Sequence, residues 1–188
     1  MSVTINGNGT ITGYTPVADG SITAAKLASG AITQSALPAG TIIKVTSGTH
    51  NSSGLSTTST SFQNYTASNI TVTKLRGPGN VSGGSILLVF GNAWIEHSSS
   101  NANSRHLVYS IMRDATEVTG LTFGMGNLYS QNAEGYQSNA DIKYMDTANL
   151  NAGDYVYSMC IKSKDGTMNA QIGNNQRLGT WNILEVAT

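Results

Sequence analysis

Apolar residues in the N-terminal part of the chain recur every five positions, a spacing that matches neither a strand nor a helix. The series consists of Val17, Ile22, Leu27, Ile32, Leu37 and Ile42. A single chain has no face on which to bury such a series, and the short helical turns predicted after Thr23 and Thr33 do not persist alone. We therefore interpret residues 20–40 as a stem in which copies of the chain share apolar layers. A flexible, low-complexity linker is the alternative interpretation.

The residues before the stem carry the pattern of a small hairpin. Two short alternating runs, Val3/Ile5 and Ile11, are separated by two Asn-Gly dipeptides at positions 6–9. Asn-Gly is a strong signal for a tight turn between strands. We predict a β element over residues 1–19, too short to be stable by itself, and assign attachment to it.

After the stem the pattern changes to that of strands. Alternating or continuous apolar runs predict strands at 41–45, 61–67, 70–75, 85–95, 105–113, 154–162 and 181–186. The unbroken run at 85–95 predicts a central strand covered on both faces. The weakly patterned segment 120–153 is predicted to contain short strands at 121–123 and 142–145. Because no helical period follows residue 45, we predict an all-β jelly-roll β-sandwich head over 41–188.

The charge balance limits the partners. Net charge is zero and 11% of residues are charged, which argues against nucleic acid and anionic membranes. The longest apolar stretch, 86–95, is too short to cross a bilayer, so we expect no membrane insertion. No targeting segment is visible, and the single Cys160 excludes an internal disulfide framework. We expect assembly in a reducing cytoplasm, with Cys160 as a buried packing residue.

Motifs for catalysis are not apparent. The glycine-rich stretch Gly77 to Gly84 lacks the lysine of a phosphate loop and is predicted to be a surface turn. Asp114 and Glu117 are predicted to lie in a charged hairpin turn beside Arg113. We therefore expect no enzyme activity, no catalytic residue and no cofactor. A glycosidase would need two carboxyls that converge in a groove, which a sequence cannot exclude.

Two histidines are weak candidates for a metal site. His97 and His106 flank the polar segment 98–104, and a hairpin there would let the imidazoles face each other. Their spacing matches no established ligand pattern. The alternative is two exposed histidines at strand ends, so we assign no metal.

Three tyrosines are candidates for contact with a host receptor. Tyr129, Tyr136 and Tyr144 lie in the long polar segment among Asn and Gln residues. Tyrosines beside amide side chains suit sugar stacking, hydrogen bonding or protein contact. The alternative is that their rings fill the ends of the sandwich as core residues.

Three stretches resemble small virion structural proteins of tailed bacteriophages, the fibre and decoration type of marine phages. They are the GSITAAKL repeat that ends in LPAGTI, the stretch TTSTSFQNYTASNITVT with the strand ILLVF, and VYSIMRDATEV with AGDYVYSMCIKS and TWNILEVAT. Their order is similar to the trimeric jelly-roll knobs of complement C1q and tumour-necrosis-factor proteins mounted on a thin stem.

This resemblance implies a homotrimer without catalysis that attaches to another virion protein through residues 1–40. We therefore expect a virion protein assembled in the host cytoplasm, a tail fibre for host attachment that contacts a host-surface glycan. A capsid head fibre or decoration protein is the alternative. A polysaccharide-degrading virion enzyme and a free-standing lectin are the alternatives from other classes.

Overall fold

Antiparallel strands dominate the described part of the chain. The computed structural model describes residues 4–5, 11–12, 37–50, 54–98, 105–122, 124–130, 136–164, 166, 169–173 and 178–188. The predicted stem residues Val17, Ile22, Leu27 and Ile32 lie outside these ranges. Near the N-terminus, β1 (Thr4–Ile5) pairs with β2 (Ile11–Thr12) in the antiparallel register Ile5 to Ile11. This pairing joins the two runs predicted to form a hairpin.

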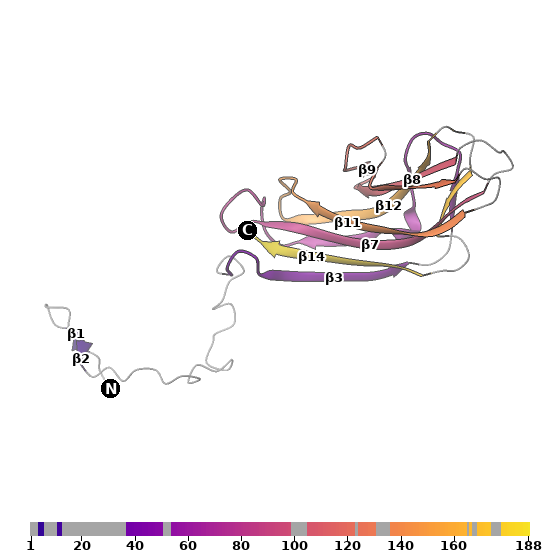
Figure 1. The fold of residues 1–188 in the computed structure, drawn as a ribbon. Helices are drawn as coiled ribbons and strands as arrows, with labels where there is room; N and C mark the ends of the chain where they lie inside the picture. Colours follow the sequence, from indigo (N-terminus) through magenta and orange to yellow (C-terminus); the bar gives the residue numbers. More distant parts are fainter. Residues whose placement is uncertain are drawn as a thin grey trace.

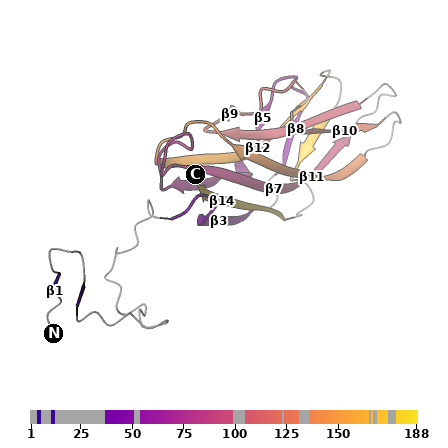
Figure 2. The ribbon, with the colours of Figure 1, turned by 60° about the vertical axis from the view of Figure 1, so that its left-hand side comes forward.

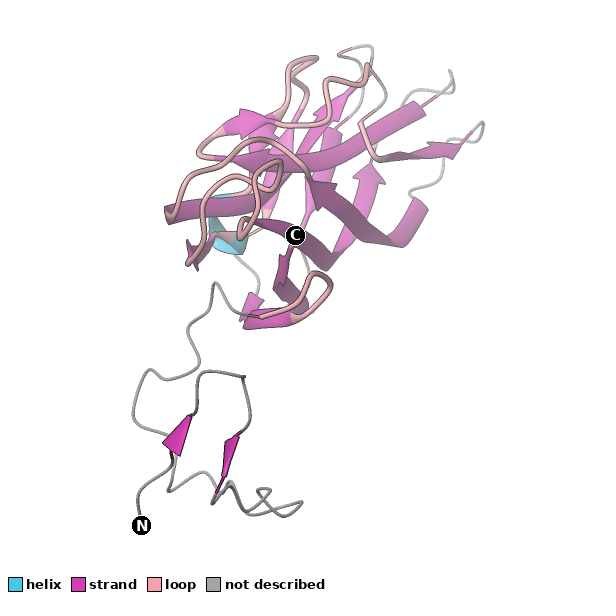
Figure 3. Cartoon of the chain, turned by 90° about the vertical axis from the view of Figure 1, so that its left-hand side faces the viewer, coloured by secondary structure: helices cyan, strands magenta, loops and turns pink. Residues whose placement is uncertain are grey.

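The remaining strands form two sheets. They are β3 (Ile42–His50), β4 (Leu55–Thr57), β5 (Gln63–Asn64), β6 (Ile70–Lys74), β7 (Ser85–Ser98), β8 (Arg105–Arg113), β9 (Thr116–Glu117), β10 (Gly126–Ser130), β11 (Tyr136–Asp146), β12 (Gly153–Ser163), β13 (Asn169–Ile172) and β14 (Gly179–Ala187). The fold is all-β, and a single 3-10 turn, Thr66–Ser68, follows β5 in the described residues. Figure 3 shows that strands and loops account for nearly all of the described chain.

The two sheets lie as layers that are compatible with a β-sandwich (Figures 1 and 2). In the first, the β7 sheet, β7 pairs with β14 and β13 along one edge and with β11 along the other, and β3 and β4 extend it. In the second, the β8 sheet, the order is β10-β8-β12, with β5 and β6 beside β12 and β9 beside β8. Every strand pair in both sheets is antiparallel.

The core lies between the sheets because alternate residues of each strand point inward. Along β14 the odd positions from Gly179 to Ala187 are buried and the even positions are at least partly exposed. Trp181 is the largest of these side chains, and its indole N–H donates to the Ser68 carbonyl at 2.7 Å. Gly91 on β7 leaves room for that ring, since a Cβ at position 91 would lie 2.4 Å from it.

The two ends of this body differ. At one end, residues 37–41 join β3 next to the C-terminal residues of β14. We call this the stem end, because residues 37–40 belong to the predicted stem. At the distal end, β7 leads toward β8 and β14 begins. Among the described residues, no helix is long and apolar enough to cross a membrane.

Most predicted strands are confirmed, with longer bounds. The strands predicted at 105–113, 154–162 and 181–186 correspond to β8, β12 and β14, and 142–145 lies inside the longer β11. On β6, Val72 and Lys74 are buried and Ile70 packs against the core, so the three residues share one face. Two predictions were wrong in detail. Leu121 and Thr122 lie in a turn, and 61–67 holds only β5 and the start of the 3-10 turn.

The prediction for β7 holds on one face only. The strand is central in its sheet, as expected, but no described segment covers the opposite face of its apolar run. Phe90, at the middle of the run, is 38% exposed.

The turn between β8 and β9 carries backbone strain. Asp114 and Ala115 both have positive φ, at 50° and 63°, and they connect the paired residues Arg113 and Thr116. Positive φ at both central residues is the geometry of a type I′ hairpin turn, which favours Asn or Asp followed by Gly. Ala115 therefore adopts a left-handed conformation that costs an L-residue about 1–2 kcal/mol.

We predict that Ala115→Gly stabilises the fold by about 1 kcal/mol, because glycine adopts this φ without strain. The matched control is Ala148→Gly in an exposed loop where φ is not positive; there the added chain entropy should destabilise by about 0.5 kcal/mol. Urea unfolding of the two variants measures both effects. Equal shifts of the same sign would contradict the strain assigned to Ala115.

Candidate functional site

One face of the β7 sheet carries apolar side chains that the described residues leave uncovered. We call this set the outer apolar face; its residues are Ile42, Val45, Ile86, Leu88, Phe90, Met145, Leu184 and Val186. Ile42, Val45 and Met145 are 53%, 56% and 54% exposed. Exposed apolar patches of this kind mark interaction sites in soluble proteins.

Strand register gathers these residues into rows at the stem end. Val45 lies opposite Leu184, Leu184 opposite Leu88, and Leu88 opposite Met145, so one row crosses four strands. A second row runs from Ile42 through Val186 to Ile86. Side chains at paired positions on one face of a sheet touch their cross-strand neighbours. The residues therefore form one continuous apolar surface.

Further from the stem end the same face becomes polar and hollowed. A hollow of about 240 Å³ is lined by Phe90, Asn92, Asp141, Lys143, Thr180 and Asn182, among others. Another of about 220 Å³ lies among Leu88, Phe90, Lys143, Tyr144 and Met145. The Asn92 amide nitrogen donates to the Thr180 hydroxyl at 2.9 Å, which orders this region. The surface thus offers apolar rows, shallow hollows and fixed polar groups together.

Residues 37–41 lead into β3 at the rim of the outer apolar face. The Gly40 N–H donates to the Ala187 carbonyl at 2.8 Å, and the Ala187 N–H donates to the Thr41 carbonyl at 2.9 Å. These bonds fix the direction of the chain as it enters β3. Leu37 is half-buried beside them, and Ile42, the last member of the five-residue series, lies on the outer apolar face. The five-residue apolar series therefore ends on the sheet, at the rim of this face.

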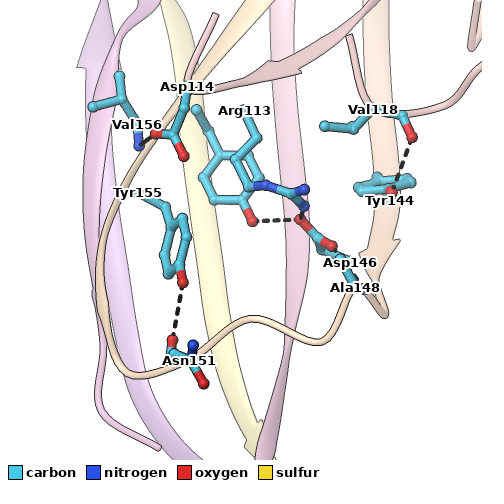
Figure 4. A network of polar contacts seen from close by, with 10 residues as sticks. Arg113, Asp114, Val118, Tyr144, Asp146, Ala148, Asn151, Tyr155 and Val156 are labelled. Carbon is cyan, nitrogen blue, oxygen red and sulfur yellow. Dashed lines mark hydrogen bonds and ion pairs between the residues drawn. The ribbon is translucent and has the colours of Figure 1, made fainter. Parts of the chain in front are cut away.

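A buried ion pair ties the two sheets together at the stem end (Figure 4). Arg113 on β8 contacts Asp146 on β11, and the Asp146 side chain is fully buried. The Tyr157 hydroxyl donates to the same carboxylate at 2.7 Å, and the Ala148 N–H donates to its other oxygen at 3.1 Å. Burial and the neighbouring Asp146 raise the pKa of Tyr157, so its hydroxyl stays a donor. Arg113, Asp146 and Tyr157 thus link the two sheets, and we call this group the clamp.

A second buried carboxylate closes the same end. Glu185 points inward from β14 and accepts hydrogen bonds from the Leu75 and Arg76 N–H groups and from the Ser85 hydroxyl. Lys74, also buried, donates to the carbonyls of Arg76 and Gly77. Burial lowers the pKa of Lys74, which Glu185 and Asp146 partly offset. The chain at 74–77 is therefore fixed by charged groups, which explains why Gly77 to Gly84 forms an ordered surface turn.

Glu117, Asp114 and Cys160, which the sequence analysis considered, are held by hydrogen bonds or buried in the fold. Burial would raise the pKa of Glu117, but donors on Ser110, Thr119 and Gly120 outweigh it and leave the pKa below its usual value. The Asp114 carboxylate accepts from the Val156 N–H at 2.9 Å, which fixes the hairpin turn. Cys160 is fully buried, as predicted, and burial raises the pKa of its thiol.

The two candidate histidines lie on different sheets. His97 is fully buried on β7, whereas His106 lies on the outer side of β8, with its ring centroid 4.3 Å from that of Tyr129. Each interacts with other groups, and no cluster of three or more metal-ligating side chains occurs in the described part of the chain. The structure thus places His106 beside a tyrosine candidate.

The three candidate tyrosines have different positions. Tyr129 on β10 is 43% exposed. Tyr144 on β11 packs against the core, and its hydroxyl lies 3.5 Å from the Val118 carbonyl, so its ring is largely used inside the molecule. Tyr136 begins β11, and its side chain lies outside the described part.

Comparison with known proteins gives no matching family model and no matching curated sequence. The interpretation of this surface therefore rests on geometry. Sequence reasoning identified Ile42 but missed Val45, Leu88, Phe90, Met145 and Leu184. The signal was available: apolar residues at consecutive positions, as in 86–90 and 183–184, place such side chains on both faces of a strand.

We predict that Asp146→Asn destabilises the fold by about 3 kcal/mol, because it leaves the Arg113 cation without its partner in a largely buried setting. Asp154→Asn, an exposed carboxylate at the same end, is the control and should stay within about 0.5 kcal/mol of the unchanged protein. Arg113→Met combined with Asp146→Leu should recover most of the loss. Urea unfolding checks this, and equal effects of the two Asn variants would refute the clamp.

A second prediction concerns pH. His50 is buried against the rings of Tyr65 and Trp181, and burial lowers its pKa from 6.5 even though its ring lies 3.2 Å from the Asn92 carbonyl. Below about pH 6.5 the unfolded chain binds a proton that the folded chain does not, so stability falls with pH until the folded pKa is reached. His50→Gln should reduce the fall in melting temperature between pH 7 and pH 5, measured at one protein concentration. An unchanged slope would contradict this role.

Proposed function

We propose that the chain is a non-enzymatic structural protein of a bacteriophage virion, a homotrimeric appendage that attaches to the particle through residues 1–40. A tail fibre that contacts the host surface is the favoured form, and a capsid head fibre or decoration protein is the alternative. The outer apolar face, which begins at Ile42 where the five-residue series ends, is the observation that supports the trimer, and the resemblance of the three sequence stretches supports the virion role.

The occupant that fits this face is a further copy of the same chain. The face begins at Ile42, where the five-residue series of the stem ends, so any copies joined along the stem are already held beside it. Joined copies have a high effective concentration for one another, which strengthens a second contact. Its hollows of about 220–240 Å³ are of a size to take protruding side chains of a neighbour.

The energetics favour covering this face. Burying one Leu, Ile, Met or Phe side chain contributes roughly 1.5–3 kcal/mol. Four members of the face are more than a third exposed in the single chain, so each retains much of that free energy for assembly. The same burial is unattainable for a stem in isolation, which must also overcome its ordering entropy.

Strand order supports a jelly-roll head. Counting the eight strands β3, β6, β7, β8, β10, β11, β12 and β14 along the chain, one sheet contains the first, eighth, third and sixth, and the other contains the second, seventh, fourth and fifth. Two four-stranded sheets whose strands alternate in this way correspond to the two Greek keys of a jelly roll. The folding pattern thus agrees with the resemblance to trimeric jelly-roll knobs.

Buried carboxylates favour a structural role over a hydrolytic one. Asp146 is paired with Arg113 and Glu185 is held by backbone N–H groups, which are the surroundings of a fold-stabilising group. A glycosidase needs two carboxyls in an accessible groove. The polysaccharide-degrading alternative is tested directly by incubation with capsular polysaccharide of the host and measurement of reducing ends.

We predict that Val45→Asp and Met145→Asp dissociate the assembly, because each places a charge in the contact between subunits. Native mass spectrometry of the unchanged protein should give three times the 19.6 kDa chain mass, and the variants should give single chains. Thr71→Asp, an exposed position on β6 in the other sheet, is the control and should remain a trimer.

If native mass spectrometry of the unchanged protein at micromolar concentration gives a folded single chain, the proposed trimer is wrong. The virion assignment has a separate test, since cryo-electron microscopy of the particle should locate the subunit on tail or capsid. A trimer that is absent from purified particles would refute the virion role and leave the assembly intact.

A further inference from the structure

The outer side of the β8 sheet carries an aromatic and basic surface at the distal end. We call it the distal patch and define it by Phe62, His106, Asn127, Tyr129 and Lys162. Register places Tyr129 opposite His106, and Asn127 opposite Val108, which in turn lies opposite Lys162. Figure 2 shows β8 and β10 side by side, extending away from the C-terminus. The patch is therefore remote from the stem.

The aromatic groups of the patch are ordered yet accessible. The rings of Tyr129 and His106 meet edge to face with centroids 4.3 Å apart, while Tyr129 stays 43% exposed. The Lys162 ammonium lies 4.4 Å from the Phe62 ring centroid, a cation–π contact that holds this lysine over the sheet. Phe62 packs against the loop before β10, since a Cβ at Gly124 would lie 3.1 Å from its ring. Ordered side chains lose little entropy on binding.

The charge of this surface has one sign. The described strand segments that form it, 63–64, 105–110, 126–130 and 158–164, contain lysines, a histidine and an arginine but no Asp or Glu. Glu117 keeps its negative charge, but it pairs opposite Met112, toward the other end of β8 from His106. The patch is thus locally basic on a chain whose net charge is zero. A local excess of positive charge on a neutral protein favours an anionic ligand.

We propose that the distal patch binds a polysaccharide whose sugars carry an anionic group, a carboxylate or a phosphate. Tyr129 presents an apolar ring with a polar hydroxyl, which suits stacking on a sugar ring. Asn127 is exposed beside it and offers a donor and an acceptor for sugar hydroxyls. Lys162 provides a charge-assisted hydrogen bond to the anionic group.

The proposal rests on the proposed function, since it names the receptor chemistry of the appendage. It is compatible with the trimer because the two surfaces use different sheets. Assembly through the outer apolar face covers the β7 sheet and leaves Asn127 and Tyr129, which are exposed on the β8 sheet, accessible. The end opposite the stem is also the one directed away from the attachment point.

The experiment is isothermal titration calorimetry of the full chain at low salt with three probes. They are a galacturonate hexasaccharide, a phosphorylated mannan fragment and neutral maltohexaose. We expect binding to one or both anionic probes and at least tenfold weaker binding to maltohexaose, with affinity falling as salt is raised. The two anionic probes distinguish a uronate from a phosphate ligand.

Variants assign the binding to the patch. Tyr129→Ala and Lys162→Gln should each weaken binding about tenfold, the effect of losing one favourable contact of about 1.4 kcal/mol. Tyr129→Phe should retain most of it if stacking dominates. Lys44→Gln, which removes the same charge at the stem end, should bind as the unchanged protein does. Native mass spectrometry of each variant should still give the assembled form.

The results separate this inference from the proposed function. A trimer that binds neither anionic probe, or one in which Lys44→Gln weakens binding as much as Lys162→Gln, overturns the distal patch alone. A single chain that binds uronate through Tyr129 overturns the trimer alone. Equal affinity for maltohexaose and galacturonate overturns the requirement for an anionic group.

Discussion

A sheet has two faces, and this chain supplies apolar residues for both faces of the β7 sheet, whereas its described residues cover only one. The inner face packs Leu87, Val89 and Ile183 against the β8 sheet, where they are fully buried. The outer face presents Val45, Leu88 and Met145 with no second layer. Much else in the structure is arranged around this imbalance: the entry of the stem at the rim of that face, and the location of exposed aromatic and basic groups on the other sheet.

The polar interior at the stem end complements that arrangement. Arg113 with Asp146 connects the sheets, and Glu185 fixes the turn that follows β6. Buried charges of this kind contribute little net stability compared with apolar packing, but removing one partner is costly. They therefore specify how the strand ends are arranged close to the outer apolar face. The apolar rows of that face depend on such a fixed framework, since they require register across four strands.

Alternation along the chain allowed the fold class and most strand positions to be predicted, because parity is a local property. The pairing order was not accessible, since it depends on contacts such as Glu185 with Leu75, which are 110 residues apart. The outer apolar face was predictable only in part. The apolar run at 86–90 indicated that both faces of the strand are buried, but the sequence does not show whether the same chain or another one covers the second face. Likewise Tyr144 was ambiguous until its parity with Ala140 and Ile142 placed it on the inner side.

The way residues 37–41 join β3 also determines how the fold responds to a pulling force. Residues 37–41 continue directly into β3, which pairs with β14 from Ile42 to His50, and the C-terminal residues of β14 are bonded at the same end. Tension applied to the chain at residues 37–41 acts along β3, so it shears this whole ladder of hydrogen bonds together and does not open them one after another. A junction of this geometry resists being pulled apart while each individual bond remains weak.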